Sequence, residues 1–408
     1  MATLWRHTAA QAADTDPKGP DMTDTTHDEP TPPAPNTQNI PSTRPEHTPA
    51  TEAPTASAAT AHTAETETGD ASRPLNVAIL GAGRIAQSMA RTLTMMSADA
   101  RYASLVTPYA VASRSAAKAR AFAQQFGLRT SFGSYRGMLA DPDVDLVYIA
   151  TPHPLHAEQA IACMRAGKHV LVEKPFAVNV DEAQRMLDVS SATNRFCGEA
   201  MWTRFMPSRL VIDRAVTSGR IGAITSVAAD LSYPMTHKKR LTDPNLAGGA
   251  LLDVGVYPLN FIDMVVGDRE ITKIVTSMTP LPTGVDAQNA TTLYFDDGTM
   301  ANATSSMMCA SERAGHIRGT NGYIDCENIN NVSAVDVYAA DHTLLDHIDV
   351  PAQLTGYEYE VAAAVRAIRA GRRDCIEMLH ADTLRMLALT DTLRAQWGLR
   401  YPFEPDPR

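Results

Sequence analysis

The feature that most constrains the fold is a glycine-rich turn set between an apolar run and a helix-like stretch. Leu75–Leu80 (LNVAIL) is typical of a strand buried on both faces, and Gly81-Ala82-Gly83-Arg84-Ile85-Ala86 follows at once. In the pattern G-x-G-x-x-A, the first glycine permits a tight turn and the second lets the backbone approach a pyrophosphate. The N–H groups at the start of the following helix attract the phosphates. The segment predicts dinucleotide binding, although such a turn can also serve only to pack a helix on a strand. The candidate cofactor-binding residues here are Gly81, Gly83, Arg84, Ile85 and Ala86.

Strand-like and helix-like segments continue to alternate up to about residue 197. This alternation predicts a parallel, doubly wound α/β sheet, that is, a Rossmann domain over 74–197. Gly127 and Gly167 stand where two of the helices should end. The further expected strands are Tyr109–Ser113, Val144–Ala150 and His169–Val172, and the expected helices are Arg84–Met96, Ala116–Phe126, Leu155–Ala166 and Val180–Ser191.

After Phe196 the pattern changes to one helix followed by a run of strands. Asp296-Asp297-Gly298 is a tight-turn signal between two of these strands. The pattern predicts a C-terminal α+β domain over 198–404 with a large, mostly antiparallel open sheet. The expected strands are Ile224–Tyr233, Ile274–Thr279, Ala290–Phe295, Met300–Ser306, Gly322–Glu327 and Ala334–Ala339, and the expected helices are Pro207–Ser218, Tyr357–Ala370 and Ala381–Gln396.

Charge and composition set the first 73 residues apart from the rest. The whole chain of 408 residues carries a net charge of −10, and residues 1–73 hold eleven acids against four bases. This segment is rich in Thr, Pro and Ala, so we expect a disordered tail that acts as an interaction segment or only as a solvated extension. The remaining body is nearly neutral, which argues against nucleic acid as a partner.

The five cysteines show no C-x-x-C spacing, and the apolar runs are short. These features predict no disulfide framework, no zinc ribbon and no membrane span. Met1–Pro20 has no apolar core of an export signal, so a cytoplasmic location is expected.

The end of the second expected strand indicates which dinucleotide is bound. An acid at this place would bind the ribose 2′-hydroxyl of NAD, whereas this chain has Ser113 and Arg114, with Lys118 one helical turn later. A guanidinium can hold a 2′-phosphate with two hydrogen bonds. The three residues therefore favour NADP over NAD, although Arg114 could also be only a solvated base at a helix start.

Two further segments carry groups suited to acid–base chemistry. Glu173-Lys174-Pro175 follows a strand at the sheet edge where ligands bind, and its lysine can stabilise an oxyanion. Asp253 and Tyr257 are spaced i, i+4, which places both on one face of a helix. Taken singly, Lys174 could be a surface lysine and Tyr257 a core tyrosine. A cis Lys174–Pro175 bond is expected at the turn.

Together with the dinucleotide motif, these segments resemble the glucose–fructose oxidoreductase / inositol dehydrogenase (Gfo/Idh/MocA) family. The resemblance rests on Glu173-Lys174-Pro175 and the segment Gly248–Tyr257, and it covers about 75–404. Trp202-Thr203-Arg204-Phe205 and the pair His153 and His156 are similar to the branch of dihydrodiol dehydrogenases and NADP-dependent xylose dehydrogenases.

The resemblance implies roles for individual residues. Tyr257 would be the general acid/base, and Lys174 would bind the reacting oxygen and lower the pKa of Tyr257. Asp253 would orient the substrate or the lysine. The resemblance also implies a substrate pocket lined by Trp202, Arg204, Phe205, Asp253 and Tyr257, and cofactor contacts from Thr151, Pro152, His153, His156, Glu173 and Lys174. No third ligand is suitably spaced to make a metal site of the histidine pair.

The sequence thus predicts an oxidoreductase that transfers hydride between NADP and a sugar, polyol or cyclic diol. Two alternatives stay open: a cofactor-binding sensor on the same scaffold, and a sugar–sugar oxidoreductase that retains its NADP. An open sheet offers a flat face for burial, so we expect a homo-oligomer, a dimer or a tetramer. The basic loop Ser232–Pro244 would suit an acidic or phosphorylated sugar, or it is only a solvated loop.

Overall fold

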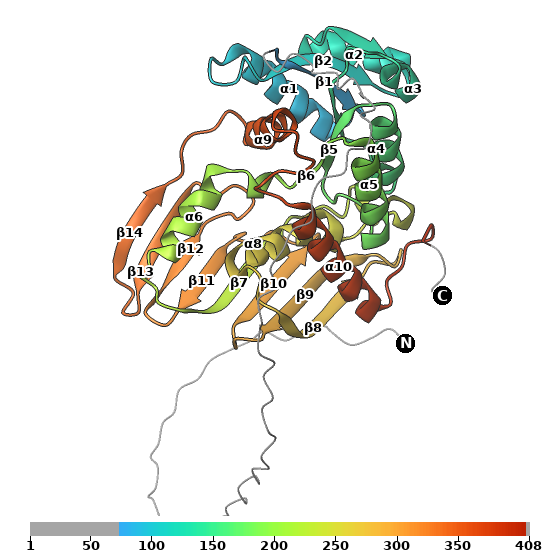
Figure 1. Ribbon diagram of the computed structural model, residues 1–408. Helices are drawn as coiled ribbons and strands as arrows, with labels where there is room; N and C mark the ends of the chain where they lie inside the picture. Colours follow the sequence, from blue (N-terminus) through green and yellow to red (C-terminus); the bar gives the residue numbers. More distant parts are fainter. Residues whose placement is uncertain (1–72, 405–408) are drawn as a thin grey trace, which may run out of the picture. The chain divides into compact units, whose positions relative to one another are not determined.

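The computed structural model describes residues 73–404 (Figure 1). The predicted tail lies outside the described residues except for Arg73. The Arg73 guanidinium pairs with the Asp145 carboxylate at 2.7 Å, at the start of the folded part.

The first part of the described chain forms a parallel sheet whose strand order is β3-β2-β1-β4-β5-β6. This order is the doubly wound arrangement with a switch point beside the first strand, which confirms the predicted Rossmann fold. The sheet reaches Ala200, so it extends past the predicted boundary at residue 197. The strands are β1 (Leu75–Leu80), β2 (Val106–Ala112), β3 (Thr130–Phe132), β4 (Leu146–Ile149), β5 (His169–Glu173) and β6 (Cys197–Ala200). The helices are α1 (Arg84–Ala98), α2 (Ala116–Phe126), α3 (Tyr135–Leu139), α4 (His156–Arg165) and α5 (Val180–Thr193).

The second part of the described chain forms a sheet of order β14-β13-β12-β11-β7-β10-β9-β8. Only β7 and β10 pair in parallel within it, so the prediction of a large, mostly antiparallel open sheet is confirmed. The strands are β7 (Ile224–Ser232), β8 (Ile271–Pro280), β9 (Asp286–Phe295), β10 (Met300–Ser306), β11 (Gly315–Gly319), β12 (Gly322–Cys326), β13 (Ala334–Ala339) and β14 (Leu344–Asp349).

Helices cover one face of this sheet and join it to the Rossmann part. In Figure 1, α6 and α8 lie over the sheet, α9 lies beside α1, and α10 runs between α5 and β8. Alternating buried residues, for example in β9, direct one side chain in two toward these helices. The bounds are α6 (Pro207–Thr217), α7 (Lys239–Thr242), α8 (Val256–Val266), α9 (Glu358–Arg369) and α10 (His380–Trp397).

Among the described residues, one helical segment, Pro244–Val266, is apolar and long enough to cross a membrane by length and composition alone. Its apolar window is 83% buried inside the structure, as is typical of a core helix.

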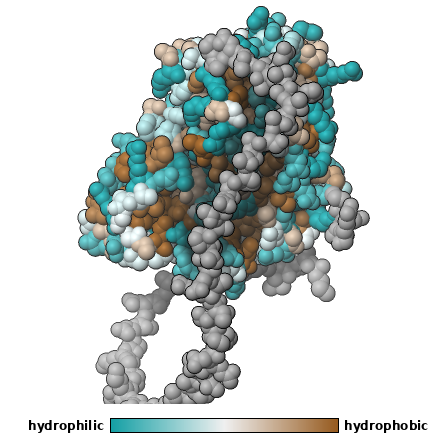
Figure 2. Space-filling model, in the orientation of Figure 1, coloured by the Kyte–Doolittle hydropathy of each residue, from teal (hydrophilic) through white to brown (hydrophobic). Residues whose placement is uncertain are grey.

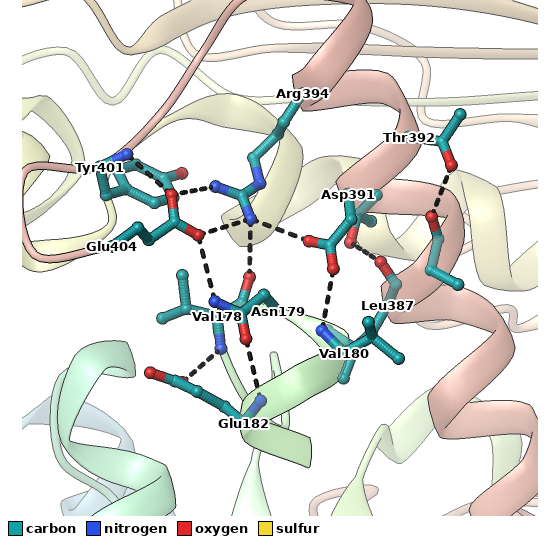
Figure 3. Close-up of polar contacts among 12 residues, drawn as sticks. Val178, Asn179, Val180, Glu182, Leu387, Asp391, Thr392, Arg394, Tyr401 and Glu404 are labelled. Carbon is teal, nitrogen blue, oxygen red and sulfur yellow. Dashed lines mark hydrogen bonds and ion pairs between the residues drawn. The ribbon is translucent and has the colours of Figure 1, made fainter. Parts of the chain in front are cut away.

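The buried Arg394 side chain links Glu404, which follows α10, to the segment that precedes α5 (Figure 3). The Arg394 guanidinium pairs with Glu404 at 2.8 Å and with Asp391 at 2.8 Å, and it also donates to the Val178 carbonyl. The Asp391 carboxylate in turn accepts the backbone N–H of Val180 at 2.9 Å. The network therefore fixes α10 against the N-terminus of α5.

The hydropathy of the visible surface differs between the two parts. Figure 2 shows more hydrophobic surface over the lobe of the large sheet than over the Rossmann lobe. Leu210 on α6 and Leu344 on β14 are both more than half exposed.

Candidate active site

A cavity of about 680 Å³ lies at the carboxyl ends of β1, β4 and β5, where segments of the second part of the chain close over it. Its size is that of a typical ligand pocket. Residues from all three predicted motifs meet there. The predicted residues that line the cavity are Gly83, Arg84, Ile85, Thr151, Pro152, His153, Glu173, Lys174, Trp202, Asp253 and Tyr257.

The glycine turn leaves room for a dinucleotide. Gly81 has φ +112°, and a Cβ there would lie 2.7 Å from the Ala150 carbonyl oxygen, so only glycine fits. At Gly83, by contrast, no described atom lies within 4 Å of an added Cβ. The backbone at Gly83 therefore faces open space at the N-terminus of α1, and a pyrophosphate fits this cradle.

The two histidines of the Thr151–His156 segment have different surroundings. His156 is fully buried, with Nδ1 2.9 Å from the Pro175 carbonyl and Nε2 2.9 Å from the Thr151 carbonyl. His156 therefore ties two loops together and does not line the cavity, in contrast to its predicted cofactor contact. His153 lines the cavity, and its buried Nδ1 has no hydrogen-bond partner among residues 73–404. Burial, assisted by His156, lowers the pKa of His153 to about 3, so the ring is neutral.

Asp253 joins two cations in the cavity. The Lys174 ammonium donates to the Asp253 backbone carbonyl at 2.5 Å and lies 3.6 Å from Oδ1. The Arg240 guanidinium donates to the same Oδ1 at 3.0 Å. Burial alone would raise the pKa of Asp253, but Lys174 and Arg240 hold that pKa below its usual range. The carboxylate is therefore ionised and fixes the position of the Lys174 side chain, whose bond to Pro175 is cis as predicted.

The contact between Lys174 and Tyr257 is made with the aromatic ring of Tyr257 and not with its hydroxyl. The Lys174 Nζ lies over the Tyr257 ring, 4.7 Å from its centroid, and the Tyr257 hydroxyl has no hydrogen-bond partner within residues 73–404. Burial, with Glu173 the next cause, raises the pKa of Tyr257 well above its ordinary value. The sequence predicted a lowered pKa for Tyr257, whereas burial, followed by Glu173, raises that pKa in the structure. The phenol is protonated at neutral pH and free to donate.

The helix that carries Asp253 and Tyr257 is irregular. Leu251–Gly255 forms one turn of π-helix, and regular α8 begins at Val256. A π-turn shifts side chains relative to an α-helix and is frequent at functional sites. Asp253 and Tyr257 still both reach the cavity.

Glu173 lines the cavity at the end of β5. Its Oε1 accepts the hydroxyl of Tyr148, and its Oε2 accepts the Lys174 backbone N–H at 3.1 Å. Burial raises the pKa of the Glu173 carboxyl. Glu173 therefore shapes the turn before Lys174, in addition to lining the cavity.

The substrate side of the cavity has an aromatic and amide wall that the sequence did not reveal. The Trp202 ring stacks on Tyr357 with centroids 4.6 Å apart, and its Nε1 donates to Asn330 at 3.2 Å. The Asn330 amide donates in turn to the Tyr233 hydroxyl at 3.3 Å. Tyr233 belongs to the predicted loop Ser232–Pro244, whereas Asn330 and Tyr357 come from two other loops that no local signal marks.

The structure does not place Arg204 and Phe205 on the cavity, which corrects both predictions. Arg204 is 6% exposed, and its guanidinium donates to Asn260 at 2.7 Å and pairs with Asp263 at 2.5 Å. Because its donors are taken by buried partners, Arg204 has a structural role. Phe205 is buried in the hydrophobic core.

The residues predicted to hold a 2′-phosphate lie at the same sheet edge as the glycine turn but do not line the cavity. The Gly81 N–H donates to the Ala112 carbonyl at 2.9 Å, which places the end of β2 beside the turn. Ser113 is buried, whereas Arg114 and Lys118 are exposed at the start of α2. Their contact with a phosphate stays a prediction. Ala86, on the core side of α1, is also buried away from the cavity.

Within residues 73–404, no group of three or more His, Cys, Asp or Glu side chains is arranged to hold a metal ion.

The fold and the cavity define a Rossmann oxidoreductase with a second, sheet-bearing domain. Residues 75–200 match the model of an oxidoreductase family with an NAD-binding Rossmann fold, and residues 210–325 match the GFO/IDH/MocA C-terminal domain. The chain belongs to the Gfo/Idh/MocA oxidoreductase family.

Similar proteins include several dihydrodiol dehydrogenases and a 3-ketoreductase. The trans-1,2-dihydrobenzene-1,2-diol dehydrogenase of Danio rerio is 32% identical over 80% of this chain and 98% of the relative. The Bos taurus enzyme of the same name is 34% identical over 61% of this chain and 72% of the relative. The 3-ketoreductase KijD10 from Actinomadura kijaniata, solved with NADP and TDP-benzene, has a TM-score of 0.70 and 28% identity over 79% of this chain and 98% of that one.

Proposed function

We propose that this protein is an NADP-dependent dehydrogenase or reductase that interconverts a hydroxyl and a carbonyl group on a sugar, polyol or cyclic diol. The observation that carries the proposal is that Lys174, Asp253 and Tyr257 converge in the cavity that holds the Gly83 cradle. The names of the relatives, dihydrodiol dehydrogenase and 3-ketoreductase, support a carbinol–carbonyl reaction.

The three side chains divide the acid–base work. The nicotinamide, when bound, supplies the hydride chemistry. The Lys174 ammonium, held by Asp253, donates a hydrogen bond to the reacting oxygen and stabilises negative charge there. The Tyr257 hydroxyl gives a proton to this oxygen during reduction and takes it back during oxidation. Because the Tyr257 phenol is protonated, the arrangement is prepared for reduction.

A substrate panel tests the proposed activity. Purified protein is assayed for a change in reduced-nicotinamide absorbance with sugars, polyols and dihydrodiols, with NADP and NAD in turn. We expect turnover of at least one substrate class. Binding of NADPH without any turnover would contradict the proposal and favour a sensor. Reduced-nicotinamide absorbance in the protein as purified would indicate the oxidoreductase that retains its cofactor.

The choice of NADP over NAD rests on Arg114, because the end of β2 bears no acid. Arg114→Ala should raise the KM for NADP about tenfold or more and change the KM for NAD little, since a lost charge-assisted pair is worth about 1.5–3 kcal/mol. Arg120→Ala, also exposed on α2, is the matched control. Equal losses for both cofactors would remove the argument for a 2′-phosphate contact.

The homo-oligomer also stays a prediction. Light scattering of the purified protein would measure its mass in solution, and a monomer would contradict the expectation.

A further inference from the structure

The loop after β7 brings two cations into the cavity. Lys238 and Arg240 both line it, whereas Lys239, between them, is exposed and does not. Lys238 is half-buried, and its ammonium forms no ion pair with any residue in 73–404. A partly desolvated cation without a counter-charge costs free energy unless a ligand supplies the charge.

The charges that line the cavity do not balance. Four cations line it, and they face two carboxyl groups, Asp253 and Glu173. Asp253 is already shared by Lys174 and Arg240, and Glu173 is engaged by Tyr148 and by the Lys174 backbone. Arg84, Lys238 and Arg240 line the same cavity, and burial, followed by repulsion from Arg84 and Arg240, lowers the pKa of Lys238. The cavity therefore has an excess of positive charge. The four cations are Arg84, Lys174, Lys238 and Arg240.

A cofactor pyrophosphate would neutralise only one end of this group. Arg84 begins α1 next to the Gly83 cradle, so it belongs to the cofactor side. Arg240 donates to Asp253 Oδ1, and the Lys174 ammonium lies 3.6 Å from the same oxygen, so Arg240 is on the side of the lysine that is proposed to bind the reacting oxygen. Its side chain is 45% exposed, and the Asp253 contact uses only part of its five N–H donors. Arg240 can therefore bind a second anion without releasing Asp253.

We propose that the substrate carries an anionic group, a carboxylate or a phosphate, which Lys238 and Arg240 bind while Lys174 and Tyr257 act on a hydroxyl or carbonyl nearby. The substrate class is then an acidic or phosphorylated sugar, not a neutral diol. This inference rests on the proposed function and narrows its substrate. An arginine with a neighbouring lysine is a common pair for holding carboxylate and phosphate oxygens.

The test compares neutral and anionic sugars on variants that differ by one loop position. D-glucose, D-glucuronate and D-glucose 6-phosphate are assayed for turnover at saturating NADP(H), and their binding to the NADPH-loaded protein is measured by calorimetry. We expect the wild-type protein to favour one anionic sugar over glucose at least tenfold. The preferred anion, carboxylate or phosphate, identifies the group that is bound.

Lys238→Gln should reduce that preference about tenfold, and Lys239→Gln, which removes the same charge one residue away, should leave it unchanged. The preference should also fall with added salt, because ion pairs at a partly exposed site are screened.

Three results would overturn the inference. Equal or better binding of glucose would do so and would leave the proposed function standing. A rise in the KM for NADP with every substrate in Lys238→Gln, with the preference intact, would assign Lys238 to the cofactor phosphates. NADPH binding with no turnover and no binding of either anionic sugar would overturn the inference, and the wider panel of sugars, polyols and dihydrodiols would decide separately whether the proposed function stands.

Discussion

Two clusters of arginine and carboxylate side chains in this molecule use the same groups in different ways. Around Arg394, which is 5% exposed, Glu404 and Asp391 supply charges at 2.8 Å and backbone groups satisfy the remaining oxygens. Around Asp253, two cations, Lys174 and Arg240, share one ionised carboxylate, and the cluster opens into a cavity. In the first cluster each charge has its counter-charge, although the buried Arg394 Nε has no hydrogen-bond partner among residues 73–404. The second cluster is open and has an excess of positive charge.

The difference separates a structural role from a functional one. A buried ion pair whose partners are all present holds elements together, and removing one member leaves a charge that nothing compensates. A cluster of charges that is incompletely paired at a cavity can be neutralised by a charged ligand. Such clusters are frequent at sites of binding and catalysis. The two clusters should therefore respond to mutation in opposite ways, one in stability and one in turnover.

The largest expected effect is the loss of turnover on removing Lys174. Lys174→Ala should lower kcat by about 10²–10⁴-fold, the usual contribution of a group that assists proton transfer. The melting temperature should change little, since Asp253 keeps its Arg240 partner. Steady-state kinetics and thermal unfolding measure the two quantities. Lys239→Ala serves as the control, and near-normal kcat in Lys174→Ala would contradict the assignment.

The opposite response is expected for Arg394. Arg394→Ala leaves the partly buried carboxylates of Glu404 and Asp391 without their cation, so the free energy of unfolding should fall by up to about 3–5 kcal/mol. Urea unfolding measures this loss, and kcat per folded molecule should stay near the wild-type value. Exposed Arg318→Ala should change stability by less than about 0.5 kcal/mol. A loss of turnover without a loss of stability in Arg394→Ala would contradict the structural role assigned to the Arg394 cluster.

The regular elements could be predicted where local signals are strong. The expected helix 116–126 agrees at both ends, because Ser115 caps it and Gly127 ends it at φ +68°. Four strands were not expected from the sequence. They are β3 and β6, which have three and four residues, β11, which has glycine at both ends, and the mostly exposed β14. These strands form because neighbouring strands pair with them, and that information is not local.

The site could be predicted only where a motif carries it. Lys174, Asp253 and Tyr257 were found because each belongs to a recognisable segment. Asn330 and Tyr357 could not be found, because loops far apart in the sequence bring them together, and Tyr233 was covered only as part of the loop Ser232–Pro244. Arg204 was misplaced because the resemblance assigned it to the pocket together with Trp202. A motif does not show that the side chain of Arg204, at the end of the 3₁₀ turn Trp202–Arg204, pairs with Asp263.

Asp286 shares one property with each cluster. Like Arg394 it is buried, and like the cavity cations it lacks a complete set of partners, since no cation pairs with it among residues 73–404. Its Oδ2 accepts the Leu251 N–H and the Asn289 amide, each at 2.8 Å, at the start of the π-turn that carries Asp253. Among residues 73–404 nothing donates to its other oxygen. Burial raises the pKa of Asp286 to about 7, so the folded protein holds this proton more tightly than the unfolded chain, where an aspartate titrates near about 3.9.

The smallest predicted effect is therefore a pH-dependent loss of stability. The contribution of Asp286 to the free energy of unfolding is complete below about pH 4 and is lost as the pH rises through about 7. Between pH 6 and pH 8 this loss amounts to about 1.4 kcal/mol. Buried Glu199, whose pKa burial also raises to about 7, acts in the same direction. Urea unfolding of Asp286→Asn across this range should show a fall in stability smaller than that of the wild type by about 1.4 kcal/mol, and Glu199→Gln should remove a similar share. Parallel pH profiles for wild type and Asp286→Asn would mean that Asp286 is ionised and paired, as the carboxylates around Arg394 are.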